Sequence, residues 1–191
     1  MIKGIARVVG DDVNTDYIIS SRRKSDAQDA ASLVEFIFED LPGPCAETSR
    51  AVGTSHAADG ARRARLINPG GIIVAGRNFG CGSAMEIACE VLRAAEVRAV
   101  VALSFARTFF RNAVNMGLTI LEADTRGVCD GDLVEILLEP GAGPPAFICR
   151  ARAMTRDIRS YEGFARELAT AGGLLAFLRT HGSIPRGILG D

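Results

Sequence analysis

The chain has 191 residues, 48% of them hydrophobic, and a formal net charge of −1. A charge this close to zero gives no electrostatic basis for binding nucleic acid or an acidic membrane surface. No apolar run approaches the length of a membrane span, and the length suits one domain with a sizeable core.

Cysteine usage sets the expected compartment and excludes a metal site. Five cysteines are scattered along the chain without a CxxC pair, and the two histidines lie far from them in sequence. This pattern fits neither a disulfide framework nor a set of metal ligands. The segment from Met1 to Ile5 opens directly into a strand-like pattern, which predicts no signal peptide. We therefore expect a reduced, cytoplasmic protein that binds no metal or cluster by itself.

The N-terminal third begins with a predicted strand over residues 3–9, followed by an Asp- and Asn-rich turn from Gly10 to Asp16. A polar loop over residues 20–26 carries three adjacent cations, a pattern that on its own indicates a solvated surface. Apolar spacing predicts a helix over residues 27–40. Residues 41–70 contain prolines, glycines and a Ser/Thr/Ala-rich stretch, and they predict an irregular insertion.

A strand–turn–helix–strand unit forms the predicted centre of the chain. Buried strands are expected at residues 71–75 and 98–104, with a glycine turn and a helix running to about Ala95 between them. Glycines at 76, 80 and 82 allow a close approach of the backbone to another group. Their spacing fits neither the P-loop nor the dinucleotide fingerprint.

Ser83 stands where this helix is expected to begin, and two interpretations are open. In the first, Ser83 and Glu86 form a capping box that satisfies backbone N–H groups. In the second, the helix N-terminus binds a carboxylate or stabilises an alkoxide at Ser83.

The C-terminal half alternates helices and strands. A helix is predicted from Ser104 to Gly117, then a strand over 118–121, an antiparallel pair over 132–139 and 146–152, and a helix over 161–180 interrupted at Gly172-Gly173. Residues 184–191 are expected to form a loosely held tail. With no repeat and no linker, residues 1–191 are predicted to be one α/β domain with a mixed sheet and flanking helices.

Several motifs carry a family resemblance. The run from Asn78 to Ser83, the segment Ser104–Arg107 with Arg111-Asn112, and the opening segment Gly10–Ile19 resemble the small subunit of 3-isopropylmalate dehydratase. That subunit corresponds to the swivelling C-terminal domain of the aconitase family. The resemblance covers nearly the whole chain and implies the swivelling β/β/α fold of the aconitase superfamily.

The resemblance also implies a function, that of the small subunit of a hydro-lyase in leucine biosynthesis that acts on 2-hydroxy di- or tricarboxylic acids. A partner large subunit is expected to carry a [4Fe–4S] cluster as Lewis acid. The small subunit supplies a serine base, and Ser83 occupies that position. Substrate binding is expected at Gly82, Ala84, Met85, Arg22, Arg23 and Lys24. Support for these residues is expected from Asp16, Asn78, Cys81, Glu86 and Arg107. No nucleic-acid or membrane partner is implied.

The chain departs from the family pattern immediately after Ser83. The family usually continues Ser-Arg-Glu-His, whereas this chain reads Ala84-Met85-Glu86-Ile87, so the arginine that binds a substrate carboxylate is absent. The covering loop has Arg22-Arg23-Lys24 where leucine-pathway enzymes generally have Arg-Tyr-Leu. We expect Arg23 or Lys24 to compensate and the preferred substrate to differ from isopropylmalate. Two alternatives stay open, a catalytically inactive paralogue that acts as a scaffold and a small-ligand binder that uses the glycine loop.

Overall fold

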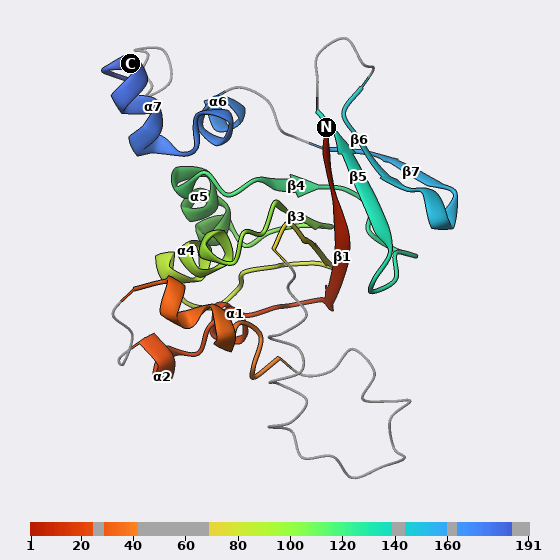
Figure 1. The fold of residues 1–191 in the computed structure, drawn as a ribbon, viewed down its shortest axis with the longest axis horizontal. Coiled ribbons are helices and arrows are strands. Elements are labelled where there is room, and N and C mark those ends of the chain that lie inside the picture. Colours follow the sequence, from red (N-terminus) through yellow and green to blue (C-terminus); the bar gives the residue numbers. More distant parts are fainter. Residues whose placement is uncertain (25–28, 42–68, 139–143, 160–163, 185–191) are drawn as a thin grey trace.

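The computed structural model describes residues 1–24, 29–41, 69–138, 144–159 and 164–184 (Figure 1). The predicted insertion over residues 41–70 and the predicted tail over 184–191 lie almost entirely outside these ranges. The first residues of the helix predicted over 27–40 also lie outside them.

A single mixed sheet of seven strands organises the chain, in the order β4-β3-β2-β1-β5-β6-β7. Neighbours among the first four pair in parallel, and the remaining pairs are antiparallel. The mixed sheet predicted from the sequence is therefore confirmed. The strands are β1 (Ile2–Gly10), β2 (Ile72–Ala75), β3 (Ala99–Ala102), β4 (Ile120–Glu122), β5 (Leu133–Leu137), β6 (Ala146–Cys149) and β7 (Met154–Asp157).

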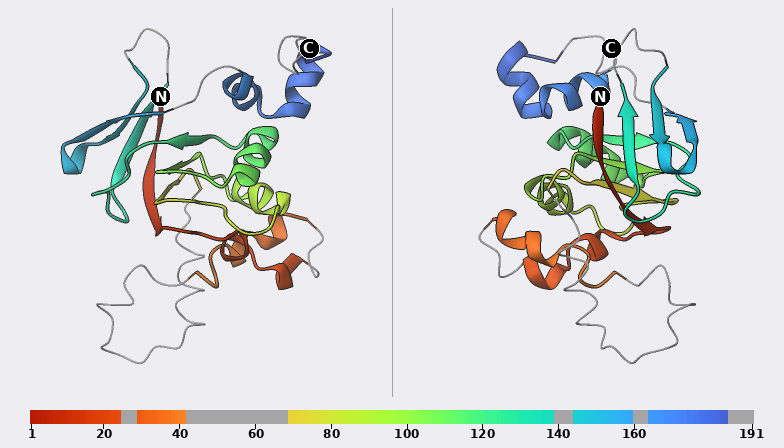
Figure 2. Two further views of the ribbon diagram at one scale, coloured as in Figure 1. Left: turned by 180° about the vertical axis from the view of Figure 1, so that it is seen from behind. Right: turned by 45° about the vertical axis from the view of Figure 1, so that its right-hand side comes forward.

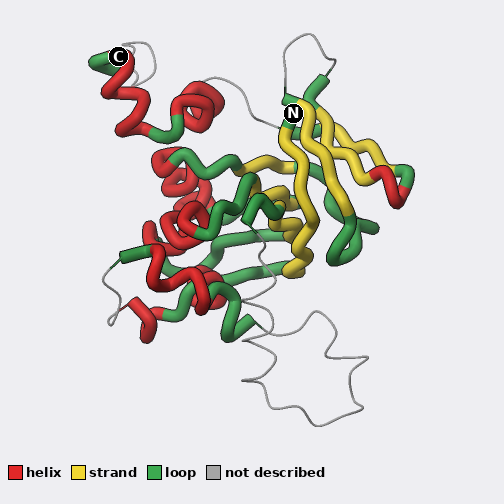
Figure 3. The backbone as a smooth tube through the Cα atoms, viewed as in Figure 1, coloured by secondary structure: helices red, strands yellow, loops and turns green. Residues whose placement is uncertain are grey.

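Helices cover one side of the parallel strands, and the antiparallel strands lie on the other side (Figures 1 and 2). Figure 3 shows the same arrangement by colour, apart from one short 3-10 helix (Arg150–Arg152) at the tip of the antiparallel strands. The helices are α1 (Thr15–Ile18), α2 (Ser21–Lys24), η1 (Ala31–Phe36), α4 (Glu86–Ala94), α5 (Arg107–Met116), η2 (Arg150–Arg152), α6 (Phe164–Ala171) and α7 (Leu174–His181), η marking a 3-10 helix.

The two faces of the parallel strands contribute to two separate cores. Along β2, Ile73 and Ala75 pack in the cluster beneath the helices, whereas Ile72 and Val74 pack against the antiparallel strands through residues such as Phe147. Side chains alternate along a strand, so burial on both faces requires a continuous apolar run. This explains why residues 71–75 and 98–104 show no polar alternation, and it produces the β/β/α layering.

The sheet curls until its two edge strands approach each other. Arg159, just after β7, pairs with Glu122 at the end of β4, and its backbone N–H donates to the Glu122 carbonyl at 2.7 Å. The side chains of Arg156 and Asp124 form an ion pair at 3.7 Å beside this bridge. The bridge and the ion pair cover part of both sheet edges, which limits their availability for pairing with other chains.

Two predicted elements differ in the structure, and the interruption predicted in the last helix is confirmed. The helix expected over 27–40 is the shorter 3-10 helix η1, because Phe38 adopts a φ of +60° and its N–H donates to the Ile18 carbonyl instead of continuing the helix. The strand predicted to reach residue 152 ends at Cys149, where η2 turns the chain into the unpredicted strand β7. The glycine pair at 172 and 173, with φ of +86° and +104°, separates α6 from α7 completely.

Two short helices, α1 and α2, lie where only turns and a loop were predicted. Asn14 caps α1, because its side-chain oxygen accepts from the Asp16 N–H at 2.9 Å. Four-residue helices bury too little to leave a periodic apolar signal in the sequence. The remaining predicted strands and the helix ending at Gly117 are confirmed, with Gly117 in the left-handed conformation.

Glu135 anchors the junction of the parallel and antiparallel strands. Its buried carboxylate accepts from Arg150 at 2.9 Å and pairs with Lys3 at 3.0 Å. Hydrogen bonds from Arg150 and then Lys3 lower the pKa of Glu135 from 4.5 to about 2.

This pairing predicts a specific acid dependence of stability. A carboxyl group with a lowered folded-state pKa stabilises the fold above its unfolded pKa and loses that contribution as pH falls. The contribution of Glu135 should therefore disappear as pH falls from about 4.5 towards about 2. Thermal unfolding of Glu135→Gln should show a lower Tm at neutral pH and a shallower fall of Tm across this window. The exposed carboxylate variant Glu35→Gln serves as the control, and an equal slope in both variants would contradict the assignment.

Candidate active site

Three chain segments meet at the edge of the sheet where β1, β2 and β3 end. They are the segment after β1 (residues 11–16), the glycine loop after β2 (residues 76–85) and the segment after β3 (residues 103–106). Parallel strands place their carboxyl ends at one edge, which is where open α/β sheets bind ligands. The predicted catalytic residue, Ser83, lies on the middle segment.

Backbone hydrogen bonds join the glycine loop to the segment after β1. The Gly80 N–H donates to the Val13 carbonyl, and the Thr15 N–H donates to the Cys81 carbonyl, both at 2.8 Å. Farther from Ser83, the Asp12 N–H donates to the Arg77 carbonyl at 2.8 Å. The two segments thus form one hydrogen-bonded unit.

The segment after β3 holds the loop from its other side. The Phe79 N–H donates to the Ser104 carbonyl at 3.1 Å, and the Ala106 N–H donates to the Phe79 carbonyl at 2.9 Å. The fully buried Phe79 ring packs edge-on against Phe109 with ring centroids 5.1 Å apart. Phe79 therefore anchors the loop in the core beneath α5.

Asn78 and Cys81 support the loop through their side chains. Asn78 adopts a φ of +57°, its N–H donates to the Ser104 hydroxyl at 2.9 Å, and its side-chain amide donates to Asp12 at 2.8 Å. The Cys81 thiol lies 3.4 Å from the Asp12 carbonyl, and burial, followed by the charge of Asp12, raises the pKa of this thiol. A neutral thiol in this position is suited to packing and weak hydrogen bonding rather than to nucleophilic chemistry.

Glycine is required at 80 and 82 for two separate reasons. Both residues have left-handed backbones, with φ of +79° and +92°, which L side chains rarely adopt. A Cβ on Gly80 would lie 2.2 Å from Phe109, and one on Gly82 would lie 2.4 Å from the Asn14 side-chain oxygen. The contact at Gly82 is what brings Ser83 next to Asn14 and Thr15.

The capping-box interpretation of Ser83 is wrong. Helix α4 begins at Glu86 with Met85 as its N-cap, and no side chain caps it. The Met85 N–H instead donates to the Ser83 carbonyl at 2.8 Å, so a turn separates Ser83 from the helix. Met85 is only 9% exposed and packs in the helix-side core, which fixes the N-cap of α4 two residues after Ser83. Among the described residues, the exposed Ser83 hydroxyl is left with one side-chain neighbour, the Thr15 hydroxyl at 3.4 Å.

Asp16 and Ser21 connect this site to α2. The Asp16 carboxylate accepts from the Ser21 N–H at 3.2 Å and also from the Ser21 hydroxyl. The Ser21 hydroxyl in turn lies 3.8 Å from the Met85 sulfur. The start of the cationic segment therefore lies directly against Met85, the residue that follows Ala84 in the glycine loop.

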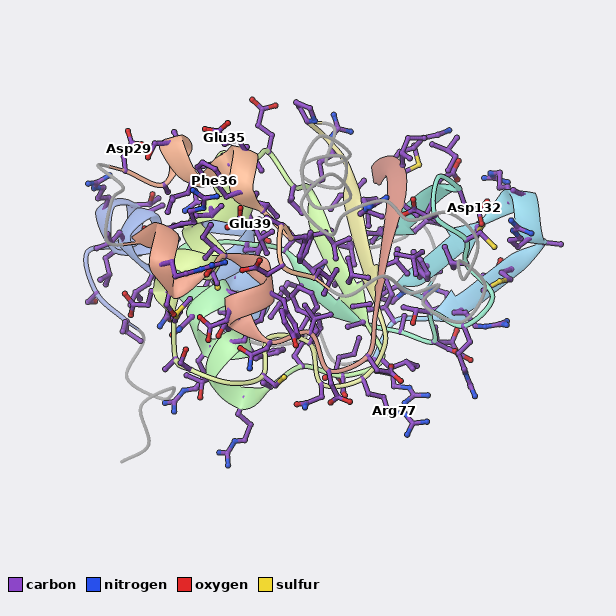
Figure 4. The ribbon with its side chains drawn as sticks, turned by 90° about the horizontal axis from the view of Figure 1, so that it is seen from below. Asp29, Glu35, Phe36, Glu39, Arg77 and Asp132 are labelled. Carbon is purple, nitrogen blue, oxygen red and sulfur yellow. The ribbon has the colours of Figure 1, made fainter. Side chains whose placement is uncertain are left out.

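Two of the three cations of this segment, Arg22 and Arg23, have protein partners. Arg23 forms a bidentate pair with Glu39, both bonds 2.8 Å long, and its guanidinium lies 3.9 Å from the centre of the Phe36 ring. Arg22 pairs with Asp40 at 2.8 Å on an exposed surface. Figure 4 shows Phe36 and Glu39 on the same chain segment. The side chain of Lys24 lies outside the described part of the chain.

The other predicted site residues are exposed to solvent. Gly82 and Ala84 flank Ser83 in solvent, and Glu86 is the exposed first residue of α4. Arg107 is exposed at the start of α5, and its side chain forms no hydrogen bond or ion pair with another described residue. Figure 4 also shows Arg77 directed outwards, away from Glu39.

Sequence reasoning missed Thr15, Asn14 and Ser104, which hold the loop together. Asn14 caps α1, Ser104 accepts from Asn78, and the buried Thr15 contacts Ser83. The only signal was the Asx-rich turn, which indicates local hydrogen bonding without identifying distant partners.

The residues that the structure describes form no metal site. Among them, no group of three His, Cys, Asp or Glu side chains has the geometry to hold a metal ion. Within the same residues, no helix is both long and apolar enough to cross a bilayer.

Comparison with known proteins defines the class of this site. Residues 33–126 match the family described as the aconitase C-terminal domain. The crystal structure of 3-isopropylmalate dehydratase from Methanocaldococcus jannaschii superposes with a TM-score of 0.74 at 33% identity, over 95% of each chain. The fold is therefore that of the aconitase-superfamily small subunit.

Sequence relatives specify the family further. The methanogen homoaconitase small subunit of Methanocaldococcus jannaschii is 35% identical over 94% of this chain and 92% of its own length. The 3-isopropylmalate dehydratase small subunit of Moorella thermoacetica is 37% identical over 93% of this chain and 95% of its own. The chain belongs to the family of 3-isopropylmalate dehydratase small subunits.

The close contact at Gly82 leads to a stability prediction. Gly82→Ala combines a strained left-handed backbone with a displaced Asn14, whose hydrogen bond to the Asp16 N–H would be lost. We expect a loss of about 2–3 kcal/mol in the free energy of unfolding. Gly131→Ala is the matched control, because Gly131 has a φ of +88° with nothing within 4 Å of the place that its Cβ would take.

The control should lose only the backbone contribution, about 1 kcal/mol. Both values come from urea denaturation of the purified variants. Equal losses for Gly82→Ala and Gly131→Ala would show that the contact with Asn14 does not constrain the loop.

Proposed function

We propose that Ser83 is the base that removes a proton next to a carboxylate of a 2-hydroxy di- or tricarboxylic acid. The observation that carries this proposal is the position of the Ser83 hydroxyl. It is exposed, it lies at the carboxyl edge of the parallel strands, and three hydrogen-bonded segments hold its backbone. The family supports this role, because its members are small subunits of hydro-lyases.

A serine hydroxyl is a weak base, so the surroundings must stabilise its alkoxide. The first N–H groups of α4 have no partner within the helix and form the positive end of its dipole. Glu86 occupies the first turn of the same helix, and its negative charge offsets part of that field. The alkoxide therefore requires an additional hydrogen-bond donor close to Ser83.

The rest of the active site is proposed to come from a partner. The relatives are named as small subunits, which implies a large subunit beside each of them. The described residues of this chain do not fit a cluster, so we place a [4Fe–4S] cluster on that large subunit, where it would act as a Lewis acid on the substrate hydroxyl. The scattered cysteines are consistent with a reduced, cytoplasmic location for the assembled enzyme.

We propose that a few residues of the site, and not overall sequence identity to the relatives, determine which substrate is preferred. Relatives of nearly equal identity are named for two activities, homoaconitase and 3-isopropylmalate dehydratase. In this chain the apolar Met85 is buried beside Ser21, at the point where the family has its carboxylate-binding arginine. We propose that Arg23 or Lys24 binds the distal carboxylate and that the preferred substrate differs from isopropylmalate.

Two observations favour a second candidate function, that of a catalytically inactive scaffold. Met85 offers no charge to a substrate, and the Arg23 guanidinium is already bound by Glu39 and Phe36. A scaffold would retain the fold and the large-subunit interface without needing the Ser83 hydroxyl.

Replacement of Ser83 separates the two functions. Ser83→Ala in the reconstituted pair should abolish turnover, because it removes the hydroxyl that the proposal assigns as the base. Since Ser83 does not cap α4, the free energy of unfolding should change by no more than about 0.5 kcal/mol. Turnover is measured with a panel of hydroxy diacids, and Ser183→Ala controls for loss of a remote exposed serine. The isolated chain should show no turnover, and a fully active, assembled Ser83→Ala enzyme would refute the proposal.

Carboxylate recognition is tested through Arg23 and its competitor Glu39. A lost charge-assisted hydrogen bond is worth about 1.5–3 kcal/mol, so Arg23→Ala or Lys24→Ala should raise KM for a diacid about tenfold or more. If Arg23 is the cation, Glu39→Gln should lower KM several-fold, because it frees the guanidinium from its protein partner.

Glu35→Gln, on the same chain segment, is the matched control (Figure 4). For an analogue without the distal carboxylate, KM should be the same in all of these variants. Unchanged KM values in both cation variants, together with normal turnover of isopropylmalate, would refute compensation by this segment.

A further inference from the structure

The Thr15 side chain is a buried polar group aimed at Ser83. Thr15 is 1% exposed, so water does not satisfy its hydroxyl. Its Oγ1 lies 3.1 Å from the Ser83 carbonyl oxygen, 3.4 Å from the Ser83 Oγ and 3.4 Å from the Asn14 side-chain oxygen.

A threonine hydroxyl has one proton, and these three oxygens compete for it. The Asn14 oxygen already accepts from the Asp16 N–H at 2.9 Å. The Ser83 carbonyl already accepts from the Met85 N–H at 2.8 Å. The Ser83 Oγ has no other side-chain partner among the described residues, so it is the neighbour whose charge state decides where the Thr15 proton points.

We propose that Thr15 is a positioning residue that orients Ser83 and donates a hydrogen bond to the Ser83 alkoxide. While Ser83 is protonated, Thr15 donates to the Ser83 carbonyl and accepts from the Ser83 hydroxyl. When Ser83 loses its proton, the Thr15 O–H rotates and donates to the alkoxide. A hydrogen bond made to the charged form alone lowers the pKa of Ser83. This inference rests on the proposed function, since it supplies the donor that the base requires.

The backbone holds Thr15 rigidly enough for this role. Its N–H donates to the Cys81 carbonyl at 2.8 Å, which ties it to the residue two positions before Ser83. It is the first residue of α1, whose cap is Asn14. The missing Cβ at Gly82 lets the Asn14–Thr15 segment approach the loop. The donor is therefore in place before substrate binds, which is the condition for electrostatic stabilisation without reorganisation.

Thr15→Val keeps the shape of the side chain and removes its proton. In the reconstituted pair, it should lower kcat about 10- to 100-fold, with KM within about twofold of the unmodified enzyme. The acidic limb of the pH profile of kcat should move to higher pH by about one unit, because the base becomes harder to deprotonate. Thr15→Ser retains the hydroxyl and should restore both kcat and the position of the limb.

The other charged and titratable residues of the segments around Ser83 are the same in all of these variants, so their effects cancel in the comparison. They include Arg77, Cys81 and Glu86 on the chain segment of Ser83, Asp11, Asp12 and Asp16 after β1, Arg22 and Arg23 on α2, and Arg107 on α5.

A second measurement needs neither the partner nor catalysis. In a Ser83→Cys background, the thiol at position 83 is a titratable reporter whose pKa can be followed by pH-dependent alkylation and peptide mass spectrometry. Adding Thr15→Val should raise that pKa by about half a unit to one unit, and adding Thr15→Ser should leave it unchanged. Peptide mass separates this thiol from Cys129, and fragment-ion spectra separate it from Cys81 and Cys89, which lie on the same peptide.

The outcomes distinguish this inference from the proposed function. If Ser83→Ala abolishes turnover while Thr15→Val leaves kcat and its pH profile unchanged, the role of Thr15 is refuted and the role of Ser83 stands. If Ser83→Ala remains active, the proposed function fails. If Thr15→Val does not assemble with the large subunit, the alkylation experiment decides, and an unchanged pKa of the reporter thiol overturns the inference.

Discussion

The close approach of the glycine loop to the segment after β1 is the constraint on which the site depends. Backbone bonds from Gly80 to Val13 and from Thr15 to Cys81 form only because residues 80 and 82 carry no side chain. With a Cβ at either position, the loop would be forced away from Phe109 or Asn14. The position of Ser83 therefore depends on the absence of side chains at Gly80 and Gly82.

Packing between the layers of the fold holds the glycine loop in a fixed position in the molecule. The Phe79 ring is buried against Phe105 and Phe109, which ties the loop to α5. The strands β2 and β3, which carry two of the three segments, are buried on both faces, and Glu135 with its two cations fixes the junction of β1 with β5. The edge of a sheet held in this way is a rigid base for exposed catalytic groups.

Much of this architecture could be predicted from local patterns. The apolar runs at 71–75 and 98–104 indicated strands buried on both faces, whereas the candidate site came from the family resemblance of the motifs around Ser83. Ser83 could not be interpreted correctly in this way, because the Ser-x-x-Glu spacing matches a capping box whether or not a helix begins there. The burial of Met85 decided the start of α4, and burial against a distant core is a tertiary effect.

The partners of the site residues were also beyond the reach of local patterns. In the sequence, Thr15 is one polar residue among several in a predicted turn. Its contact with Ser83 joins residues 68 positions apart. Arg23 reads as a solvated cation, yet Glu39 and the face of Phe36 hold its guanidinium. Both cases depend on which side chains the fold brings together, and a single sequence contains no direct record of such pairs.

Few cations lie on the segments around Ser83 to bind the carboxylates of a substrate. The loop offers Met85 instead of a cation, Glu86 opposes the dipole of α4, and Arg22 and Arg23 on α2 are paired with Asp40 and Glu39. Under the proposed function, recognition of a hydroxy diacid requires rearranged ion pairs on α2, the charge of Lys24, charges from a partner subunit, or a combination of these. The position of the proton-abstracting group relative to the substrate is common to all of these possibilities.

The most direct test of that position is a structure of the assembled pair with its hydroxy acid bound. The measurement is the distance from the Ser83 Oγ to the carbon next to the substrate carboxylate from which the proton is removed. The account predicts about 3–3.5 Å, the separation at which a base attacks without further rearrangement. A Ser83 hydroxyl turned away from the substrate, with another side chain at that distance from the same carbon, would contradict it.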